Sequence, residues 1–281
     1  TFVGFDAHGG EGKTMGLAGY GDPKPLLSKL KDVVKLNADG SFVLDESYFS
    51  FRTGKRLWRE KWEKTFGKPR LVGEPWEQHH YDLAASCQEL VEEVIITNAR
   101  LLQERTGLKN LCLAGGVTLN CVANAKILER TGFTNIFVQP AAGDAGGALG
   151  AALYVYHALY GLGPRQKLDH AYLGPEFSDD EIEKALEASG LKARKVDENT
   201  LCREVAQAIH ANKAIGWFQG RMEFGPRALG NRSIIGNATF NGMKDILNLR
   251  IKKREPFRPF APIVLEEKCS EYFHLSIKSP Y

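Results

Sequence analysis

Hydrophobic residues recur every three or four positions between Trp76 and Arg105, the spacing that one buried face of an α-helix produces. The residues with this spacing are Leu83, Cys87, Leu90, Val91, Val94 and Leu101. Gly107 follows, and glycine commonly ends a helix because it adopts the left-handed conformation at little steric cost. The pattern predicts one long helix that ends just before Gly107.

Downstream of this helix, short apolar runs alternate with longer helical patterns. NLCLAGG (110–116) and NIFVQP (135–140) each predict a buried strand that runs into a turn. TLNCVANAKILERTG (118–132) and AAGDAGGALGAALYVYHALYG (141–161) have helical character. Strand, helix, strand, helix at this spacing is typical of a parallel α/β unit, so we predict an α/β fold.

The stretch GLGPRQK, at 161–167, is the best candidate linker. We place a boundary there, which gives one domain over 1–163 and a second over 164–281. Beyond the linker, Ser178 and Glu181 form the sequence pattern of a helix capping box. The remaining pattern predicts helices over 201–213 and 242–253 and strands over 41–45, 214–218, 233–238 and 261–267.

Composition narrows the class of protein. The 281 residues are 43% hydrophobic and 25% charged, which is ordinary for a globular protein. No apolar run approaches the roughly 20 residues of a transmembrane helix, so we expect no membrane association. The five cysteines form no CxxC pair and are interpreted as reduced thiols of a cytoplasmic protein. The chain begins at Thr1 without a signal-peptide pattern, so we expect a fragment of a longer chain.

Positive charge is concentrated in one segment. The chain has a net charge of +3, but residues 219–260 carry nine Lys or Arg against three Asp or Glu, a local net charge of +6. The rest of the chain is therefore close to −3. This imbalance indicates an anionic ligand near the basic segment.

A glycine-rich run near the start contains Gly12, Lys13 and Thr14, which is how a phosphate-binding P-loop ends. A P-loop also requires a glycine five residues before its Gly-Lys-Thr, and that position holds Ala7. We therefore reject a P-loop, and the glycines need another explanation.

Two glycine turns follow the predicted parallel strands. In LAGGVTLN (113–120), a strand that ends in Gly-Gly lets a ligand approach the backbone, as a nucleotide phosphate or ribose would; a simple tight turn is an equal alternative. In QPAAGDAGGALGAA (139–152), Asp144 lies at a strand end, where functional residues of α/β sheets gather. Asp144 would ligate a metal or cap the next helix, and Gly146 would serve ligand approach or packing.

The basic segment consists of FQGRMEFGPRALGNRSIIGNA (218–238) and RIKKREPFRPFAP (250–262). Arginine binds phosphate or carboxyl groups with two hydrogen bonds, and lysine adds a point charge. Phenylalanines alternate with the charges, which favours the wall of a folded pocket over a solvated basic face. A single-stranded nucleic-acid platform is the other alternative.

Five motifs together resemble one family: GEGKTMGLAGYG, CLAGGVTLNCVAN, FVQPAAGDAGGALGAAL, GRMEFGPRALGNRSI and KKREPFRPFAPIVLEE. They occur in the right order across the whole chain. The family is the O-carbamoyltransferases, typified by the nodulation, cephalosporin and tobramycin carbamoyltransferases.

The resemblance implies two active sites. Residues 1–163 would be the later part of an actin/Hsp70-like (Kae1-like) nucleotide-binding domain, and 164–281 an incomplete YrdC-like α/β domain. The second would make carbamoyl-adenylate from carbamoyl phosphate and ATP. The first would move the carbamoyl group to a hydroxyl of a sugar, antibiotic or nodulation-factor-type acceptor.

The resemblance also implies roles for residues in the first domain. Glu11 would bind the ribose hydroxyls, with Lys13 as a nearby polar contact, and Asp144 would ligate an iron-type metal (Fe²⁺). The other residues expected at the nucleotide are Gly10, Gly12, Gly115, Gly116, Asn120 and Gly146. The paired metal-binding histidines and an early catalytic histidine of the family would lie before Thr1, so we expect no carbamoyl transfer by these 281 residues alone.

In the second domain, Arg227, Lys252 and Arg258 would bind carbamoyl phosphate and the ATP phosphates, where positive charge stabilises phosphoryl and adenylyl transfer. Second choices are Arg221, Arg232 and Arg254. Mg²⁺ would accompany the ATP phosphates.

Two alternatives stay open. One is a threonylcarbamoyl-type transferase acting on tRNA, and the other is a nucleic-acid-binding module that uses residues 219–260. Fusion of both domain types in one chain favours a small-molecule carbamoyltransferase, so we do not expect nucleic acid to be the partner. The acceptor cannot be inferred from the sequence, and a homodimer is left open.

Overall fold

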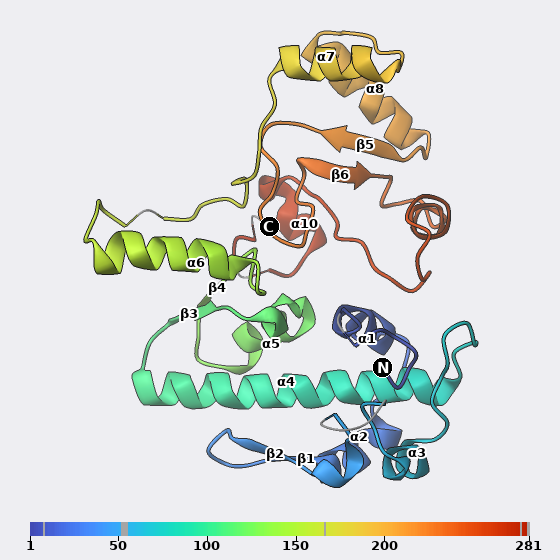
Figure 1. Cartoon of the computed structure of the whole chain (residues 1–281), viewed down its shortest axis with the longest axis vertical. Helices are drawn as coiled ribbons and strands as arrows, with labels where there is room; N and C mark the ends of the chain where they lie inside the picture. The colour runs from blue at the N-terminus through green and yellow to red at the C-terminus, as the bar shows by residue number, and fades with distance from the viewer. Residues whose placement is uncertain (8, 52–55, 166, 276, 280–281) are drawn as a thin grey trace. The chain divides into compact units, whose positions relative to one another are not determined.

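A computed structural model describes residues 1–7, 9–51, 56–165, 167–275 and 277–279 (Figure 1). The chain forms two compact units. Unit 1 contains Thr1–Val138 and Phe257–Pro259, and unit 2 contains Gln139–Pro256 and Phe260–Tyr281. The predicted domain boundary after residue 163 lies within unit 2, and it stays a prediction about domains.

Unit 1 is organised around the predicted long helix, which is α4 (Gln78–Thr106). Gly107 ends the helix with φ of 65°, and its N–H donates to the carbonyl of Gln103. Both the helix and its glycine cap are confirmed, because each depends on local sequence that the pattern records directly.

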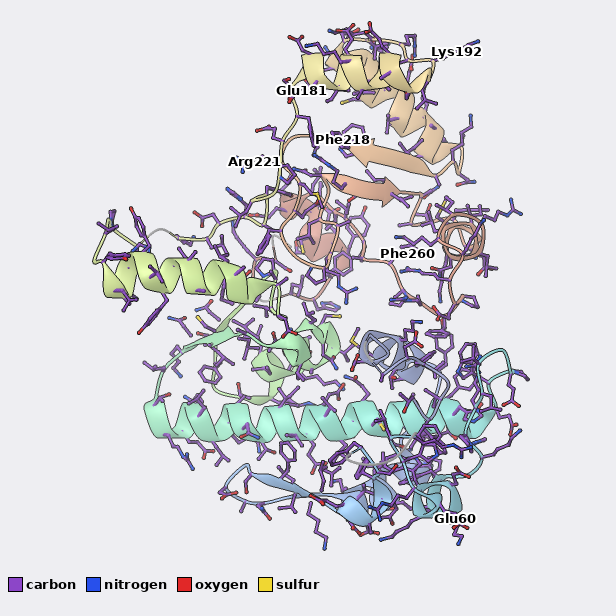
Figure 2. All side chains as sticks on the ribbon, viewed as in Figure 1. Glu60, Glu181, Lys192, Phe218, Arg221 and Phe260 are labelled. Carbon is purple, nitrogen blue, oxygen red and sulfur yellow. The ribbon has the colours of Figure 1, made fainter. Side chains whose placement is uncertain are left out.

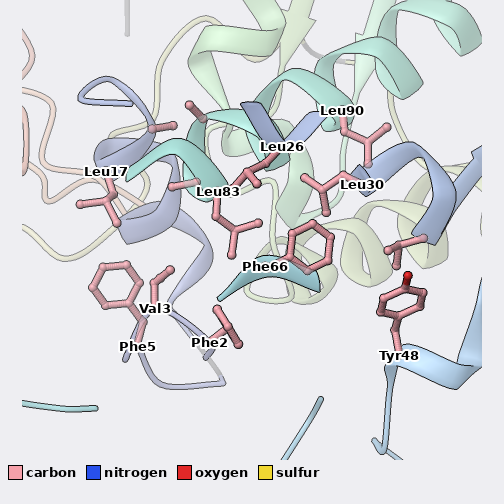
Figure 3. Packing of buried hydrophobic residues seen from close by; sticks show 14 of the residues in the cluster. Phe2, Val3, Phe5, Leu17, Leu26, Leu30, Tyr48, Phe66, Leu83 and Leu90 are labelled. Atoms are coloured by element: carbon pink, nitrogen blue, oxygen red, sulfur yellow. The ribbon is translucent and has the colours of Figure 1, made fainter. Parts of the chain in front are cut away.

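Shorter elements surround α4. They are α1 (Glu11–Ala18), α2 (Lys24–Val33), the antiparallel strands β1 (Val34–Leu36) and β2 (Phe42–Leu44), η1 (Glu46–Tyr48) and α3 (Glu60–Phe66). Helices α1 and α2 both pack against α4. Leu17, Leu30 and Leu83 come from these three helices and are buried in one hydrophobic cluster (Figure 3). Burial of this cluster holds the amino-terminal elements to α4.

The predicted parallel α/β unit is present. β3 (Asn110–Leu113) pairs in parallel with β4 (Asn135–Val138), and η2 (Gly116–Leu119) and α5 (Cys121–Arg130) connect them. Leu111 lies opposite Ile136 in the register. A second cluster, formed by Ala99, Leu111, Ile127 and Phe133, packs this unit on α4. The α/β class is confirmed, whereas the Kae1-like and YrdC-like assignments stay predictions.

Unit 2 begins with α6 (Gly146–Tyr154), which continues into the π-helical turn η3 (Val155–Leu159). The helices α7 (Asp179–Ser189) and α8 (Glu198–His210) precede an antiparallel pair, β5 (Ile215–Phe218) and β6 (Arg232–Ile235). The predicted capping box starts α7: Ser178 Oγ accepts from the Glu181 N–H, and the Ser178 N–H donates to the Glu181 carboxylate.

Two predictions for the end of the chain are wrong in detail. The helix predicted over 242–253 is a short α9 (Met243–Asp245) that widens into the π-helix η4 (Ile246–Ile251). The strand predicted over 261–267 has no pairing partner among the described residues; η5 (Glu266–Lys268) and α10 (Cys269–Tyr272) follow instead. Pro262 has no N–H to donate to a sheet, which disfavours a paired strand there.

No helix within the described ranges combines the length and apolarity needed to cross a membrane.

His80, at the start of α4, leads to a prediction about pH. Its Nδ1 accepts from the Glu77 N–H at 3.0 Å, and its Nε2 lies 3.0 Å from the Lys68 carbonyl oxygen. These partners require a neutral ring with the proton on Nε2. Burial is the main cause that lowers the pKa of His80 from 6.5.

Because the folded pKa is depressed, the unfolded chain binds the proton more readily, and the free energy of unfolding decreases as pH falls below the unfolded value. We expect the urea midpoint of unit 1 to be lower at pH of about 5.5 than at about 7.5. His80→Gln, which keeps an acceptor for the capping box, should reduce this difference. The exposed His210→Gln of unit 2 should leave it unchanged; an unchanged difference in His80→Gln would contradict the assignment.

Candidate functional site

The glycine-rich run near the start forms the beginning of α1. Gly10 is the N-cap residue, and the Glu11 carboxylate accepts from the Gly9 N–H at 3.0 Å. A Cβ on Gly10 would lie 2.5 Å from the Asp6 carbonyl oxygen, so glycine is required there for packing. The Lys13 ammonium lies 5.6 Å from the centre of the Phe5 ring, which is a cation–π distance.

Glu11 is exposed at the amino end of this helix, and no described atom beyond the helix backbone and the neighbouring residues lies within 4 Å of a Cβ added at Gly12. The segment therefore provides an accessible helix start with one carboxylate. Such a start can receive a polar ligand group such as a ribose hydroxyl.

The glycine turn after β3 is also loosely packed at its Cβ positions. Gly115 has φ of +104°, which favours glycine, and apart from the chain neighbours no atom of the described residues lies within 4 Å of a Cβ on Gly115 or Gly116. The glycines at this turn are therefore not explained by close packing at their Cβ positions. An open backbone turn agrees with ligand approach, although it does not identify the ligand.

Asn120, predicted to face the nucleotide, is occupied by contacts within the protein. Its Oδ1 accepts from the Ala123 N–H at 3.1 Å, which caps α5. Its side chain also exchanges two hydrogen bonds with Gln88 of α4, at 3.1 and 2.9 Å. Asn120 thus has a clear structural role, in which it joins the glycine turn to α4.

The same contacts continue into a buried ion pair. Gln88 Nε2 donates to Glu92 Oε1 at 2.9 Å, and Lys126 of α5 pairs with the other oxygen of that carboxylate. Glu92 is 3% exposed. Neither Gln88 nor Glu92 stood out in the sequence, because polar residues at helical spacing are ordinarily solvent-facing.

The turn after β4 presents Asp144 on the surface. The helix that follows has Ala145 as its N-cap, with no side-chain cap, so the alternative that Asp144 caps α6 is wrong. A Cβ on Gly146 would lie 2.1 Å from the Ala141 carbonyl oxygen, so packing alone accounts for this glycine.

Asp144 does not by itself fit a metal site. Among the residues that the structure describes, no three His, Cys, Asp or Glu side chains gather so that they could hold a metal ion. A single carboxylate is too few ligands for an iron-type ion. The metal therefore stays a prediction.

Arg232 is fully engaged within unit 2. Its guanidinium donates to the carbonyl oxygens of Gln219, Asn231 and Gly220, at 2.7, 2.8 and 3.1 Å. Its Cζ also lies 3.5 Å from the centre of the Phe218 ring. These contacts hold the loop between β5 and β6 closed, so Arg232 is a poor candidate for a phosphate ligand.

Arg254 is held in a similar way. Its Nε donates to Asn248 Oδ1 at 2.7 Å, and its guanidinium lies 4.7 Å from the centre of the Phe260 ring. Asn248 is completely buried. Lys253 is next to it with φ of 46°, an uncommon value for a residue with a side chain. The predicted second-choice arginines thus include two that support the backbone.

Arg221, Arg227 and Lys252 are exposed in unit 2 (Arg221 is labelled in Figure 2). Arg258 belongs to the segment Phe257–Pro259 of unit 1. A common phosphate site for Arg227, Lys252 and Arg258 therefore stays a prediction.

A buried carboxylate lies within the basic segment and was not singled out in the sequence. Glu223 is 6% exposed and its Oε1 accepts backbone N–H groups from Leu229 and Asn231 at 2.7 and 2.8 Å. The available signal was a lone acidic residue between arginines, followed by glycines at 225 and 230.

Unit 1 contains an apolar cavity of about 310 Å³ beside α1. Its aromatic lining comes from Phe2, Phe49, Phe51, Trp58 and Trp62, and among the residues that the structure describes no lining side chain is charged. This lining suits an apolar or stacked ring.

Comparison with known proteins gives two family matches. A model described as the carbamoyltransferase N-terminus matches residues 1–153, and one described as the carbamoyltransferase C-terminus matches residues 206–281. The predicted boundary after residue 163 falls between the two matches.

Similar curated proteins include two nodulation proteins. The chain is 43% identical to nodulation protein NolNO of Sinorhizobium fredii, over 94% of this chain and 38% of that protein. It is 41% identical to nodulation protein NolO of Bradyrhizobium diazoefficiens, over 94% of this chain and 47% of that protein. It is 47% identical to the uncharacterized protein sll1178 of Synechocystis, over all of this chain and 47% of that protein. The chain thus spans about half the length, or less, of these relatives.

Proposed function

Because this chain belongs to the carbamoyltransferase family, we propose that it takes part in ATP-dependent transfer of a carbamoyl group to a hydroxyl. The observation that carries the proposal is the order of the two family matches along one chain. The carboxy-terminal match contains Arg227 and Lys252 within the segment of net charge +6.

The proposed reaction has three steps. Water releases carbamate and phosphate from carbamoyl phosphate. An oxygen of carbamate then attacks the α-phosphorus of ATP, which forms carbamoyl-adenylate and expels pyrophosphate. Finally, the acceptor hydroxyl attacks the carbamoyl carbon, AMP leaves, and the hydroxyl proton is lost to a base. The first two steps concentrate negative charge on phosphate oxygens, which explains the need for cationic side chains.

Arg227 and Lys252 are the residues that we assign to this charge. Arg227 is exposed on a loop with an ordered backbone, and its guanidinium can bind two phosphate oxygens at once. Lys252 is exposed at the end of η4 and adds a point charge. Arg258 is a separate candidate for phosphate binding in unit 1, whereas Arg232 and Arg254 support the backbone of unit 2.

We expect residues 1–153, the region of the amino-terminal family match, to hold the adenylate. The open turn at Gly115 and Gly116 allows close approach of a ligand, and Glu11 is available for the ribose. We expect Mg²⁺ to come with the ATP phosphates, where it would neutralise part of their charge. We propose that the acceptor hydroxyl belongs to a sugar, antibiotic or nodulation-factor-type molecule, as the resemblance to the O-carbamoyltransferases implies.

The test is exchange of labelled pyrophosphate into ATP, measured with and without carbamoyl phosphate on the 281-residue chain. We expect exchange only when carbamoyl phosphate is present. In Arg227→Ala the exchange rate should fall by about a hundredfold, because a donor that stabilises the phosphate charge is removed. Lys252→Ala should act in the same direction. Arg203→Ala, an exposed arginine of α8 outside the basic segment, is the matched control and should exchange normally.

Two results would overturn the proposal. One is a chain that neither exchanges pyrophosphate nor binds ATP or carbamoyl phosphate in calorimetry. The other is strong binding of single-stranded RNA that falls steeply with salt and is lost in Arg227→Ala, since this would favour a nucleic-acid module.

A further inference from the structure

The loop between β5 and β6 is held by one buried carboxylate. Glu223 Oε1 accepts the backbone N–H groups of Leu229 at 2.7 Å and Asn231 at 2.8 Å, with the Arg232 N–H further away at 3.4 Å. Three converging N–H groups form the kind of site that usually binds an anion. Here the anion is a side chain of the protein itself.

Other contacts complete the loop. The Tyr172 hydroxyl donates to the Leu229 carbonyl at 2.9 Å, and the Gly230 N–H donates to Ser233 Oγ at 2.9 Å. The Asn231 side chain donates to the Arg221 carbonyl at 2.7 Å. These hydrogen bonds satisfy backbone polar groups of the loop from within the protein.

The other side of the loop rests on the turn that follows β4. Gly225 has φ of +142°, and a Cβ there would lie 2.8 Å from the Pro140 carbonyl oxygen. The Phe224 N–H donates to the Ala171 carbonyl at 2.7 Å. The loop is thus fixed at both ends, by Glu223 at one and by close backbone contact at the other.

Arg227 lies between these two anchors, exposed and next to Pro226, whose ring restricts the backbone. The charge of Glu223 is stabilised by hydrogen bonds from the backbone N–H groups of Leu229 and Asn231. Burial works against its charged form, but the N–H groups of Leu229 and Asn231 outweigh it and hold the pKa of Glu223 below its usual value. The Glu223 carboxyl group is therefore ionised at neutral pH.

We propose that Glu223 is a positioning residue that holds the 224–232 loop in its binding conformation and so presents Arg227 to a phosphate group of the substrate. The inference rests on the proposed function, in which Arg227 binds carbamoyl phosphate or ATP. A loop that is ordered in advance spares the ligand the cost of ordering it, and a small displacement of a charged donor weakens binding strongly.

The experiment compares Glu223→Ala, Glu223→Gln and the control Glu183→Gln, an exposed glutamate of α7. Amide hydrogen exchange of Leu229 and Asn231 should be at least about tenfold faster in Glu223→Ala, because their acceptor is gone. It should stay near the native rate in Glu223→Gln, whose amide oxygen can still accept. Unchanged exchange at Leu201 in α8 will show that the variant remains folded.

Pyrophosphate exchange gives the second measurement. The KM values for carbamoyl phosphate and for ATP are both measured, and the KM of the one whose phosphate Arg227 binds should rise by about tenfold in Glu223→Ala with a smaller change in kcat. Glu223→Gln should restore most of the loss. The double variant Glu223→Ala with Arg227→Ala should be no worse than Arg227→Ala alone, since one residue acts through the other.

The outcomes separate the two proposals. If Arg227→Ala has no effect, or the native chain shows no exchange of pyrophosphate, the proposed function fails, while amide exchange still reports whether Glu223 orders the loop. Native amide rates in Glu223→Ala would overturn the positioning role. Faster amides with an unchanged KM, or losses that add in the double variant, would overturn it as well.

Discussion

Replacing Lys126 by Met should lower the free energy of unfolding of unit 1 by about 3–5 kcal/mol, because it leaves a buried carboxylate without its cation. The carboxylate is that of Glu92, which is 3% exposed on α4. Its remaining hydrogen-bond donor would be Gln88 at 2.9 Å, a neutral amide. Methionine matches the length of the lysine stem, so the expected loss is due to charge and not to a cavity.

Urea unfolding followed by tryptophan fluorescence can measure this effect, since Trp58, Trp62 and Trp76 all belong to unit 1. The matched control is Lys64→Met, which removes the exposed pair with Glu60 on α3 and should cost no more than about 0.5 kcal/mol. The double variant Glu92→Met with Lys126→Met should recover stability to within about 1 kcal/mol of native. A similar cost for Lys126→Met and Lys64→Met would show that the buried pair is not coupled as described.

The ion pair also supports the candidate site. Glu92 and Gln88 lie one helical turn apart on α4, and Gln88 holds Asn120 at the end of the open glycine turn. Loss of Lys126 should therefore loosen the turn at Gly115 and Gly116 as well as α5.

Gly21→Ala should destabilise unit 1 by about 3 kcal/mol or more, through steric overlap with the backbone of α4. An added Cβ would lie 2.1 Å from the Tyr81 carbonyl oxygen and 2.7 Å from the Asp82 nitrogen. Neither atom can move alone, since both belong to a helix of 29 residues. The segment after α1 is held there by Asp22, whose N–H donates to Asp82 Oδ1 at 2.9 Å.

The control for this variant is Gly12→Ala. Gly12 lies in α1, and its added Cβ would meet no described atom within 4 Å apart from the helix backbone and its chain neighbours. Alanine should therefore stabilise the helix by about 0.5–1 kcal/mol. Urea midpoints of the two variants and the native chain suffice for the comparison. If Gly21→Ala unfolds at the native midpoint, α1 does not pack on α4 in the way described.

Local patterns predicted the elements well. The apolar spacing of α4, its glycine cap at Gly107 and the capping box at Ser178 involve residues at most a few positions apart, so their physics is contained in a short window. The parallel pair of β3 and β4 was also predictable, because strands separated by one helix usually join a parallel sheet. The strand predicted over 261–267 failed for the opposite reason, since a strand needs a partner that its own sequence does not specify.

For single residues of the candidate site, too, a role that depends on distant parts of the chain could not be predicted from local sequence. The sequence identified Arg232 and Arg254 as cations, but their roles depend on carbonyl oxygens and rings to which the folded chain brings them. It identified Gly146 as a glycine near a ligand, whereas the Ala141 carbonyl explains that glycine without one. The role of Glu223 could not be predicted from the sequence, because the backbone N–H groups that bind its carboxylate come from six to nine residues further along the chain.

By itself, the sequence determined the family, the α/β class and the order of the main helices and strands of this protein. These depend on motifs and periodicity, which adjacent residues carry. Only the tertiary structure decided which polar side chains stabilise the fold through hydrogen bonds within the protein and which are exposed candidates for ligand binding. That choice depends on hydrogen-bond acceptors and close contacts between segments far apart in the chain, such as Glu92 with Lys126 and Gly225 with Pro140.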